Sequence, residues 1–403
     1  MTATMRRALV VGGGIGGLAT AGALSRSGWQ VTVLERADRI RVEPTALLLW
    51  PNAIRALRAL GLSAGLDAIA TPLPDAGVRR PDGRWLVRPR PEPAAATPVV
   101  VHREDLHDAM IAGLGDRVEL RTGFTVRTVR SEDGQRPAVG DGHDLIEADL
   151  IVGADGIDSV VRSRLAPDSV AVSAGCVAWR AVLPWYRAPK LPADQPVNGE
   201  VLGAGYRFVS VSLGERGSSG GSSRGGIYWV ATAAGAPRPE PAQTQLALLQ
   251  RWYADWPAPI GELLAATEPA DLVQQEVREL RPLPQHYGRT AGPGGLVLLG
   301  DAAHAMPHHL GQGACLALED AATLTGLVRE TAPGEPLRAA VEAYQRLRRP
   351  RVAEVVRQTR RMSAVLRSRG RLALRARDAA LSTISPRLVQ QAGSTAGRWR
   401  PPL

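Results

Sequence analysis

The chain has 403 residues, of which 44% are hydrophobic and 22% charged, a composition typical of a globular protein with two or three domains. A net charge of +10 would suit nucleic-acid binding, but the aromatic-rich and zinc-finger patterns of such proteins are missing, so no nucleic-acid partner is expected. Two distant cysteines and the lack of a long uninterrupted apolar run predict a cytoplasmic protein without a membrane span.

The first predicted unit is a strand, a glycine-rich turn, a helix and a second strand. The strand at 8–11 (ALVV) is short and apolar, as in buried parallel sheets, and GGGIGG follows it. The second strand, QVTVLER, ends in Glu35 and Arg36. Glu35 stands where dinucleotide-binding units carry the acid that accepts hydrogen bonds from ribose, and Arg36 would soften its repulsion of a 2′-phosphate.

The glycines of this turn fill the pattern GxGxxG, and each has a separate predicted task. Gly12 allows the tight turn, Gly14 lets the backbone approach a pyrophosphate, and Gly17 lets the helix pack closely on the strand. The N–H groups at the helix start, around Ile15, favour phosphate binding. A merely glycine-rich turn is the alternative for the pattern alone, but the flanking strands and acid favour an ADP-containing dinucleotide.

Two later segments repeat the order of strand, acidic turn and helix. DLIVGADGIDSVVRSRL (149–165) places Asp155 after a buried strand, and GLVLLGDAAHAMPHHLGQGACLALEDAATL (295–324) places Asp301 there. In the second segment a helix begins near Gly311, after a loop. Acid-bearing turns at three strand ends suit a long ligand that lies across one edge of a sheet.

With these three motifs in order, the chain resembles the flavoprotein aromatic hydroxylases, single-component FAD monooxygenases that share the p-hydroxybenzoate hydroxylase fold. VHREDLHDAM (101–110), LWPNAIRALRALGL (49–62) and GCVAWR (175–180) extend the resemblance over most of the chain. It implies FAD as cofactor and NAD(P)H as a transient co-substrate. It also implies transfer of one oxygen atom from O2 to an electron-rich aromatic or heteroaromatic ring, through a flavin hydroperoxide.

The resemblance also assigns residues to the cofactor. Asp301 would bind the ribityl chain of FAD, and Arg103 would approach the cofactor from the second segment of the flavin domain. Asp155 would lie between the cofactor and the nicotinamide site. The helix start would direct N–H groups at the pyrimidine end of the isoalloxazine, through Gly311, Gly313 and Ala314.

The implied fold is α/β, with a Rossmann-type FAD-binding domain interleaved with a β-rich substrate domain and followed by C-terminal helices. The FAD-binding domain is predicted to comprise residues 1–70, 97–170 and 285–330. The substrate domain would comprise 71–96 and 171–284, and the C-terminal helices and tail 331–403. The arginine-rich helices are expected to cover the flavin domain, and WRPPL at the end of the chain is expected to be a loose tail.

Two strands of the substrate domain carry the candidate substrate residues. RFVSVSL (207–213) and GIYWVATA (226–233) are predicted to be neighbours, joined by the flexible loop GERGSSGGSSRGG. Arg207 and Tyr228 match positions that face the oxidised ring in the urate- and salicylate-hydroxylase-like branch. They would hold a carboxylate or carbonyl and a phenol or enol oxygen; a surface arginine and a packed tyrosine are the alternative. Arg180 is expected to bridge the domains.

The chain departs from the family pattern at two places near the flavin. His308 replaces the usual proline and would either relay protons or face solvent. PTALLLW (44–50) replaces the usual glycines and makes the lining narrower and more apolar. His304 is expected to pack within its loop, and because no metal-ligand spacing is evident, no metal site is expected.

The leading hypothesis is therefore an FAD-dependent, NAD(P)H-dependent monooxygenase that hydroxylates a small aromatic or heteroaromatic molecule. An epoxidase or indole oxygenase in natural-product tailoring is an alternative, as is a non-catalytic flavin-containing protein that binds a ligand. A flavin halogenase is disfavoured because the chain has no WxWxIP motif and no lysine in the required place. The choice between NADH and NADPH and the oligomeric state stay open.

Overall fold

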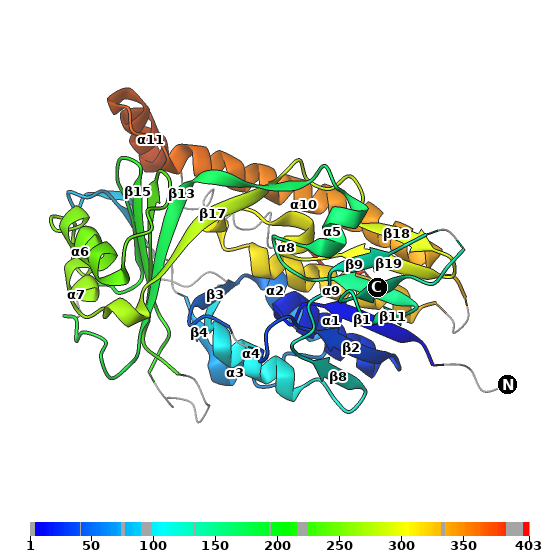
Figure 1. The fold of residues 1–403 in the computed structure, drawn as a ribbon. Helices are drawn as coiled ribbons and strands as arrows, with labels where there is room; N and C mark the ends of the chain where they lie inside the picture. Colours follow the sequence, from blue (N-terminus) through cyan, green and yellow to red (C-terminus); the bar gives the residue numbers. More distant parts are fainter. Residues whose placement is uncertain are drawn as a thin grey trace.

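The computed structural model describes residues 5–40, 42–73, 77–89, 98–132, 134–192, 195–215, 224–331, 335–383 and 398–402. Residues 216–223 of the predicted flexible loop lie outside this part of the chain. The described chain is a mixed α/β fold in which one large sheet stands at each end and a long helix spans both (Figure 1). The predicted fold class is confirmed, whereas the exact domain boundaries stay a prediction.

The first large sheet has six strands in the order β18-β19-β12-β1-β2-β8. Their bounds are β1 Arg7–Val11, β2 Gln30–Leu34, β8 Val118–Arg121, β12 Leu150–Gly153, β18 Gly288–Ala291 and β19 Gly294–Leu298. All pairings are parallel except that of β18 with β19. Because parallel strands end at the same edge, the turns after β1, β12 and β19 bring the three motifs of the sequence together.

Helices and a small sheet cover this parallel sheet. Helix α1 (Ile15–Arg26) packs against β1, β2 and α9 (Gly313–Arg329), and α5 (Val160–Leu165) packs against β12. The small antiparallel sheet consists of β9 (Thr128–Arg130), β10 (Ala138–Gly140) and β11 (Leu145–Glu147). Strands buried on both faces explain the continuous apolar runs of β12 and β19.

The second large sheet has seven strands in the order β17-β13-β16-β15-β14-β5-β6. Their bounds are β5 Val78–Arg79, β6 Trp85–Val87, β13 Val170–Leu183, β14 Gly199–Leu202, β15 Tyr206–Ser212, β16 Ile227–Ala234 and β17 Val273–Arg281. Strands β15 and β16 pair antiparallel, as the sequence predicts. Helices α6 (Ala242–Trp252) and α7 (Ile260–Ala265) cover the outer face (Figure 1), followed by the short turn η1 (Pro269–Asp271).

The alternation of side chains gives this sheet two different faces. Phe208 and Trp229 stack at 5.4 Å between ring centres and lie in the core shared with α6 and α7. Their strand neighbours Arg207, Val209 and Tyr228 point to the opposite face, toward the six-stranded sheet. The sheet thus presents a mixed polar and apolar wall to the six-stranded sheet.

A third layer joins the two large sheets at the bottom of Figure 1. It is the antiparallel sheet β3-β7-β4, with β3 Ala46–Leu49, β4 Ala70–Pro72 and β7 Val99–His102. Around it lie α2 (Pro51–Ala59), α3 (Leu66–Ile69) and α4 (Arg103–Ala112). The segment PTALLLW therefore forms a strand whose side chains can face the space between the large sheets.

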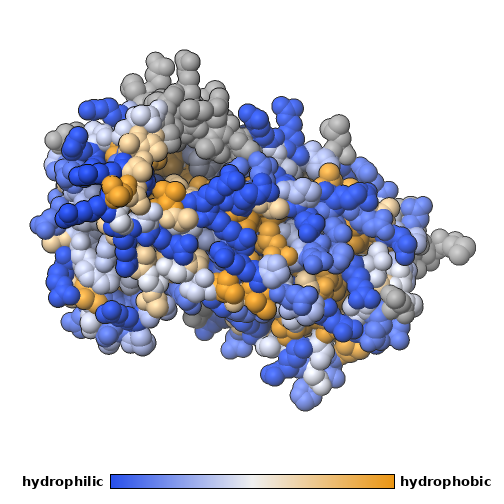
Figure 2. Space-filling view, turned by 90° about the horizontal axis from the view of Figure 1, so that it is seen from above, coloured by the Kyte–Doolittle hydropathy of each residue, from blue (hydrophilic) through white to orange (hydrophobic). Residues whose placement is uncertain are grey.

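The C-terminal segment differs in part from its prediction. Helix α10 (Arg338–Leu366) covers α9, β18 and β19, but α11 (Arg371–Thr383) packs on the substrate sheet, where Arg377 donates to the Gly203 carbonyl at 2.7 Å. Figure 2 looks from above onto the face that carries α10 and α11, which is mostly hydrophilic. The prediction of a loose tail is wrong for Trp399. This residue packs against the hydrophobic core around the six-stranded sheet, and its backbone carbonyl accepts a hydrogen bond from Arg55 Nε at 2.9 Å.

Candidate functional site

One cavity of about 1470 Å³ lies between the carboxyl edge of the six-stranded sheet and the inner wall of the seven-stranded sheet. It exceeds the usual 300–1,000 Å³ of a pocket for one small ligand, so it has room for two. Its wall gathers predicted residues from the first and third motifs, from the second flavin segment and from the substrate strands: Gly14, Ile15, Gly17, Arg103, Asp301, Gly311, Gly313, Ala314, Arg207, Tyr228 and His308.

The glycine-rich turn is closed on one side and open on the other. Gly12 has φ +106°, and a Cβ there would lie 2.4 Å from the Ala154 carbonyl oxygen. A Cβ on Gly17 would lie 2.0 Å from the Gly12 oxygen, so both positions need glycine. At Gly14, which precedes helix α1, a Cβ would meet nothing within 4 Å. The backbone there is open to a ligand, and no side chain caps the helix.

Glu35, Arg36 and Gly12 lie at this turn but do not line the cavity. The Glu35 carboxylate accepts hydrogen bonds from the backbone of Gly13 at 2.9 Å and of Ala37 at 3.0 Å. Arg36 is exposed beside it. The acid is thus fixed at the end of β2, next to the glycine turn.

Asp155 follows β12 and is engaged with helix α5. Its carboxylate accepts hydrogen bonds from the Ser159 hydroxyl and from the backbone of Val160 at 2.8 Å and Val161 at 3.2 Å. Burial raises the pKa of Asp155, while these hydrogen bonds act in the opposite direction. Its chain neighbours Ala154 and Gly156 line the cavity, whereas Asp155 itself caps the helix.

Arg103 and Asp301 are the charged pair of the cavity floor. Arg103 begins α4, and its buried Nε has no hydrogen-bond partner among the described residues. Burial lowers the pKa of Arg103, and the negative charges of Asp301 and Glu43 act against that effect. Asp301 opens the short helix α8 (Asp301–His304) after β19, with an exposed side chain. A ligand along this floor would meet both charges.

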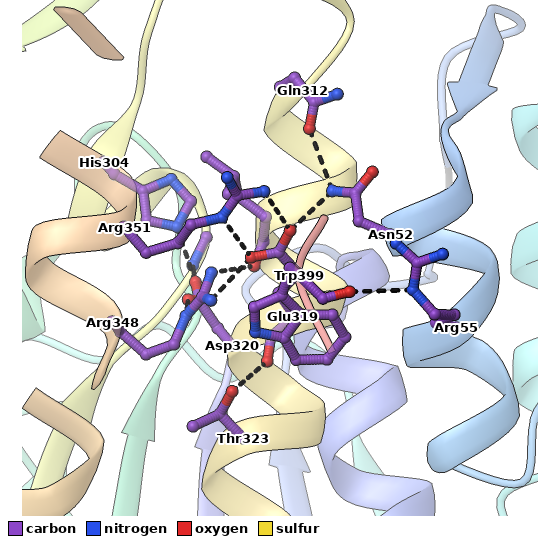
Figure 3. A network of polar contacts seen from close by, with 12 residues as sticks. Asn52, Arg55, His304, Gln312, Glu319, Asp320, Thr323, Arg348, Arg351 and Trp399 are labelled. Atoms are coloured by element: carbon purple, nitrogen blue, oxygen red, sulfur yellow. Dashed lines mark hydrogen bonds and ion pairs between the residues drawn. The ribbon is translucent and has the colours of Figure 1, made fainter. Parts of the chain in front are cut away.

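The start of α9 holds a residue that the sequence analysis did not single out. The Gln312 side chain accepts a hydrogen bond from Asn52 Nδ2 at 3.1 Å, and the same Nδ2 donates to Glu319 at 2.6 Å (Figure 3). Because a carboxylate only accepts, Glu319 fixes the orientation of the Asn52 amide and hence that of Gln312. The Gln312 Nε2 is buried without a partner among the described residues, and Gln312 lines the cavity.

A buried ion network holds α9 to α10 (Figure 3). Arg348, 1% exposed, donates to Asp320 at 2.6 Å and to Glu319 at 2.7 Å. Arg351 adds a second contact to Glu319 at 2.9 Å. Burial by itself would raise the pKa of Asp320, but Arg348 and His304 lower it to about 2, and the carboxylates raise the pKa of Arg348 against the effect of burial.

His304 contacts this network rather than its own loop. Its Nε2 lies 2.6 Å from Asp320, whose second oxygen atom is held by Arg348. The predicted packing within the loop is therefore replaced by a bond to α9. Across the described ranges of the chain, no three histidine, cysteine or acidic side chains are placed to hold a metal ion. In those ranges, too, no helix is long and apolar enough to cross a membrane.

Arg207 lines the cavity, but its charge is already paired. Its Nε donates to Glu200 Oε1 at 2.7 Å and its Nη2 to Glu200 Oε2 at 3.1 Å, a bidentate contact across the β14–β15 hairpin. Arg207 as a whole is 8% exposed. The sequence analysis assumed a free cation here, and it overlooked Glu200, which lies seven positions earlier on the adjacent strand.

Tyr228 and His308 form the polar part of the wall near α9. His308 lies in η2 (His308–Leu310), and its Nε2 is 3.4 Å from the Thr232 hydroxyl. Burial lowers the pKa of His308 well below its usual value, aided by Arg180, so the ring is neutral. Burial raises the pKa of Tyr228, which keeps its phenol protonated. His308 thus faces the cavity and not bulk solvent.

Arg180 was expected to bridge the domains, and the structure shows that it also lines the cavity. Its Nη1 donates to Gln275 at 2.6 Å, a neutral partner, and its charge acts on both His308 and Tyr228. The sequence signal was present in GCVAWR but did not indicate which way the side chain points along β13. Beside Tyr228 and His308, the cavity therefore carries Arg207, which is paired with an acid, and Arg180, whose hydrogen-bond partner is neutral.

The donor set fits FAD, the cofactor that the resemblance implies. The open turn at Gly14 suits a pyrophosphate, and two buried donors, Arg103 Nε and Gln312 Nε2, lack a protein partner within the described chain. The exposed Asp301 carboxylate between them offers an acceptor for hydroxyl groups. These groups belong to one continuous wall, which matches a long ligand with phosphates at one end and a ring at the other.

Comparisons with known proteins agree with this geometry. The family model of the FAD binding domain matches residues 5–359. The chain is 32% identical to the aurachin C monooxygenase/isomerase of Stigmatella aurantiaca over 86% of both chains. It is 31% identical to the 3-hydroxybenzoate 6-hydroxylase of Klebsiella oxytoca, over 91% of this chain and 90% of that one.

A solved structure shares the whole architecture. HpxO of Klebsiella pneumoniae, crystallised with FAD and uric acid, superposes with a TM-score of 0.79 at 25% identity. The match covers 97% of this chain and 96% of that one. The arrangement of the large sheets around one cavity is thus shared with a protein known to hold both a flavin and a ring.

Proposed function

The chain belongs to the FAD-binding-domain family of FAD-dependent hydroxylases, and from this premise we propose that it uses NAD(P)H and O2 to hydroxylate an electron-rich aromatic or heteroaromatic small molecule. One observation carries the proposal. The floor formed by Arg103, Asp301 and the start of α9 shares one cavity with the substrate-strand residues Tyr228 and His308. A ring bound at those two residues would lie against the flavin end of that floor.

The chain's own residues would hold FAD in three places. The backbone at Gly14, Ile15 and Gly17 would bind the pyrophosphate, with Glu35 on the ribose and Arg36 beside it. Asp301 would accept hydrogen bonds from the ribityl hydroxyls, with Arg103 close by. The backbone of Gly311, Gly313 and Ala314, together with Gln312 Nε2, would donate to the pyrimidine end of the ring system.

When bound, FAD supplies the redox chemistry, taking electrons from NAD(P)H and activating dioxygen. The chain's contribution at the ring would be orientation and proton handling. Tyr228 would donate a hydrogen bond to a ring oxygen, because its phenol stays protonated. His308 would accept a proton or hydrogen bond, because its ring is neutral and its Nδ1 has no partner among the described residues.

The walls would also keep water from the reacting centre. Val209, Val230 and Val277 line the cavity beside Tyr228, and Leu48 lines it from β3. Exclusion of water strengthens hydrogen bonds at the ring and protects reactive oxygen species from side reactions. This apolar lining supports a monooxygenase and fits the replacement of the family's usual glycines by PTALLLW.

The test is anaerobic stopped-flow reduction of the bound flavin by NADH and by NADPH, with and without phenolic, purine and indolic ligands. We expect one nicotinamide to reduce the flavin, and one ligand class to raise that rate at least tenfold. Product analysis with 18O2 should then show one labelled oxygen atom in the ring. If neither nicotinamide reduces the flavin under any condition, the hydroxylase is refuted in favour of a flavin-holding binding protein.

A further inference from the structure

The cavity extends beyond Tyr228 into a region whose side chains the proposed chemistry uses only as an apolar wall. There the inner face of β15 approaches the sheet β3-β7-β4, and apolar side chains from both meet in one cluster. We name this region the apolar lobe and define it by Leu48, Leu73, Val100, Val209 and Val211. Tyr228 packs against the same cluster and marks its inner end.

The apolar lobe is part of the cavity rather than closed core. All five of its side chains line the cavity, and so do Val78 and Val87 from β5 and β6 farther out. Arg88, the exposed neighbour of Val87, follows at the outer end. A ring held at Tyr228 and His308 would therefore have an apolar channel continuing from it, which starts at Leu48 beside Gly311 and extends to Val78 and Val87.

The charges around the ring position add a second constraint. Glu200 binds the Nε–Nη2 edge of the Arg207 guanidinium with both of its oxygen atoms, so the two side chains together carry no net charge. His308, which is half-buried, and His309, which is buried, are both neutral, because desolvation lowers the pKa of each. Arg180, whose partner is the neutral Gln275, acts with its charge on His308 and Tyr228 as well as on Arg103, so the cation of the ring position lies there and not in the apolar lobe. A substrate carboxylate at Arg207 would have to displace Glu200.

We propose that the substrate is an aromatic or heteroaromatic ring with an uncharged aliphatic substituent that occupies the apolar lobe. This inference rests on the proposed function and adds the chemical class of the substrate. The ring lies beside Tyr228 and His308, and the substituent lies between Val209 and Val211 on one side and Leu48 and Val100 on the other. Each buried methylene then adds to the binding free energy without any new polar contact.

The test measures binding to the FAD-loaded protein by equilibrium dialysis, which needs no turnover. The probes are 4-alkylphenols from ethyl to nonyl and, as the charged counterpart, 4-hydroxybenzoate. We expect Kd to fall about fourfold per added methylene until the lobe is filled. We expect 4-hydroxybenzoate to bind at least tenfold more weakly than 4-ethylphenol.

Two matched pairs of variants locate the effect. Val209→Thr puts a hydroxyl into the lobe at nearly constant volume and should weaken binding of 4-nonylphenol about tenfold with little effect on 4-ethylphenol. Val230→Thr is its control, because Val230 is the cross-strand partner of Val209 on β16 but lies outside the lobe cluster. Glu200→Gln should release Arg207 and improve 4-hydroxybenzoate binding about tenfold, whereas Glu276→Gln, another cavity-lining acid, should not.

The outcomes separate this inference from the proposed function. If flavin reduction responds to ring carboxylates and Kd does not depend on alkyl length, the substrate class is wrong and the hydroxylase stands. If alkylphenols bind with the expected length dependence but never accelerate flavin reduction, the hydroxylase is wrong and the lobe remains a binding site for aliphatic groups. Equal effects of Val209→Thr and Val230→Thr on all ligands would overturn the location of the lobe.

Discussion

Replacing Arg348 with methionine tests the buried ion network. Arg348 lies on α10 and is the one partner that contacts both Glu319 and Asp320 among the described residues, at 2.7 Å and 2.6 Å. Methionine fills a similar volume but leaves both carboxylates fully buried with less compensation. Removing one partner from a buried ion pair typically lowers the free energy of unfolding by about 3–5 kcal/mol, because the remaining charge keeps its desolvation cost.

The pKa of Asp320 gives a second route to the magnitude. It is about 2 in the folded protein, below the roughly 3.9 of an unfolded aspartate. A lowered pKa contributes stability that is present above about pH 4 and is lost as the pH falls through 2; here that stability is about 2–3 kcal/mol. In Arg348→Met this contribution should already be missing at pH 7, so the difference from the wild type should shrink below pH 4.

The assay is urea unfolding at pH 7 of the apoprotein, followed by the Kd for FAD. Arg351→Met is the matched control, because Arg351 contacts Glu319 from a partly exposed position on the same helix, and it should lose less than half as much stability. The combined variant Glu319→Gln, Asp320→Asn, Arg348→Met should recover part of the loss. An Arg348→Met protein as stable as the wild type, or one less affected than Arg351→Met, would refute the reasoning.

Three further predictions concern the cavity. Asp301→Ala should leave a folded protein that loses FAD on gel filtration, and full flavin occupancy would contradict the assigned role, with Asp158→Ala outside the cavity as control. Arg207→Met should weaken ligand-stimulated flavin reduction more than basal reduction. It should also lower the free energy of unfolding by about 3–5 kcal/mol, because it leaves the Glu200 carboxylate without its ion-pair partner. The double variant Arg207→Met, Glu200→Gln should therefore be more stable than Arg207→Met alone. Burial lowers the pKa of His309 to about 3, whereas a histidine of the unfolded chain is protonated below about pH 6.5. Because only the unfolded state binds this proton, the free energy of unfolding falls as the pH is lowered. His309→Gln should remove about 2 kcal/mol of the stability difference between pH 7.5 and pH 5, measured by urea unfolding, and an unchanged difference would show that His309 is not the group responsible.

The sequence predicts well where the turns after β1, β12 and β19 lie, because their positions follow from the parallel strands that precede them. A parallel strand followed by a glycine-rich or acidic turn ends at the same sheet edge whatever lies elsewhere, so Gly14, Asp155 and Asp301 were predictable as neighbours. The β15–β16 pair followed equally from alternation and chain order. What the pattern could not give was the function of Asp155, whose carboxylate caps α5, a contact decided by the turn geometry.

The missed residues fall into two kinds. Glu200 was within reach of sequence reasoning, because the turn at 203–205 makes a hairpin and puts Glu200 diagonal to Arg207 on one face. Gln312, Arg348 and Trp399 were not, because their contacts depend on how α9, α10 and the C-terminal residues pack on one another. Helical periodicity predicts a buried face but not which buried charge meets which.

The ion network affects the electrostatic environment of the flavin floor, because both involve helix α9. The start of α9 can stabilise negative charge on a ligand only while its positive end is not cancelled by nearby acids. Glu319 and Asp320 lie six and seven residues from Gly313, about 10 Å along the axis, and unpaired carboxylates there would oppose that end in a low-dielectric interior. Arg348 and Arg351 neutralise them, and Glu319 also orients Gln312 through Asn52. Arg348→Met should therefore lower the midpoint potential of bound flavin as well as its affinity, whereas a purely structural arginine would change affinity alone.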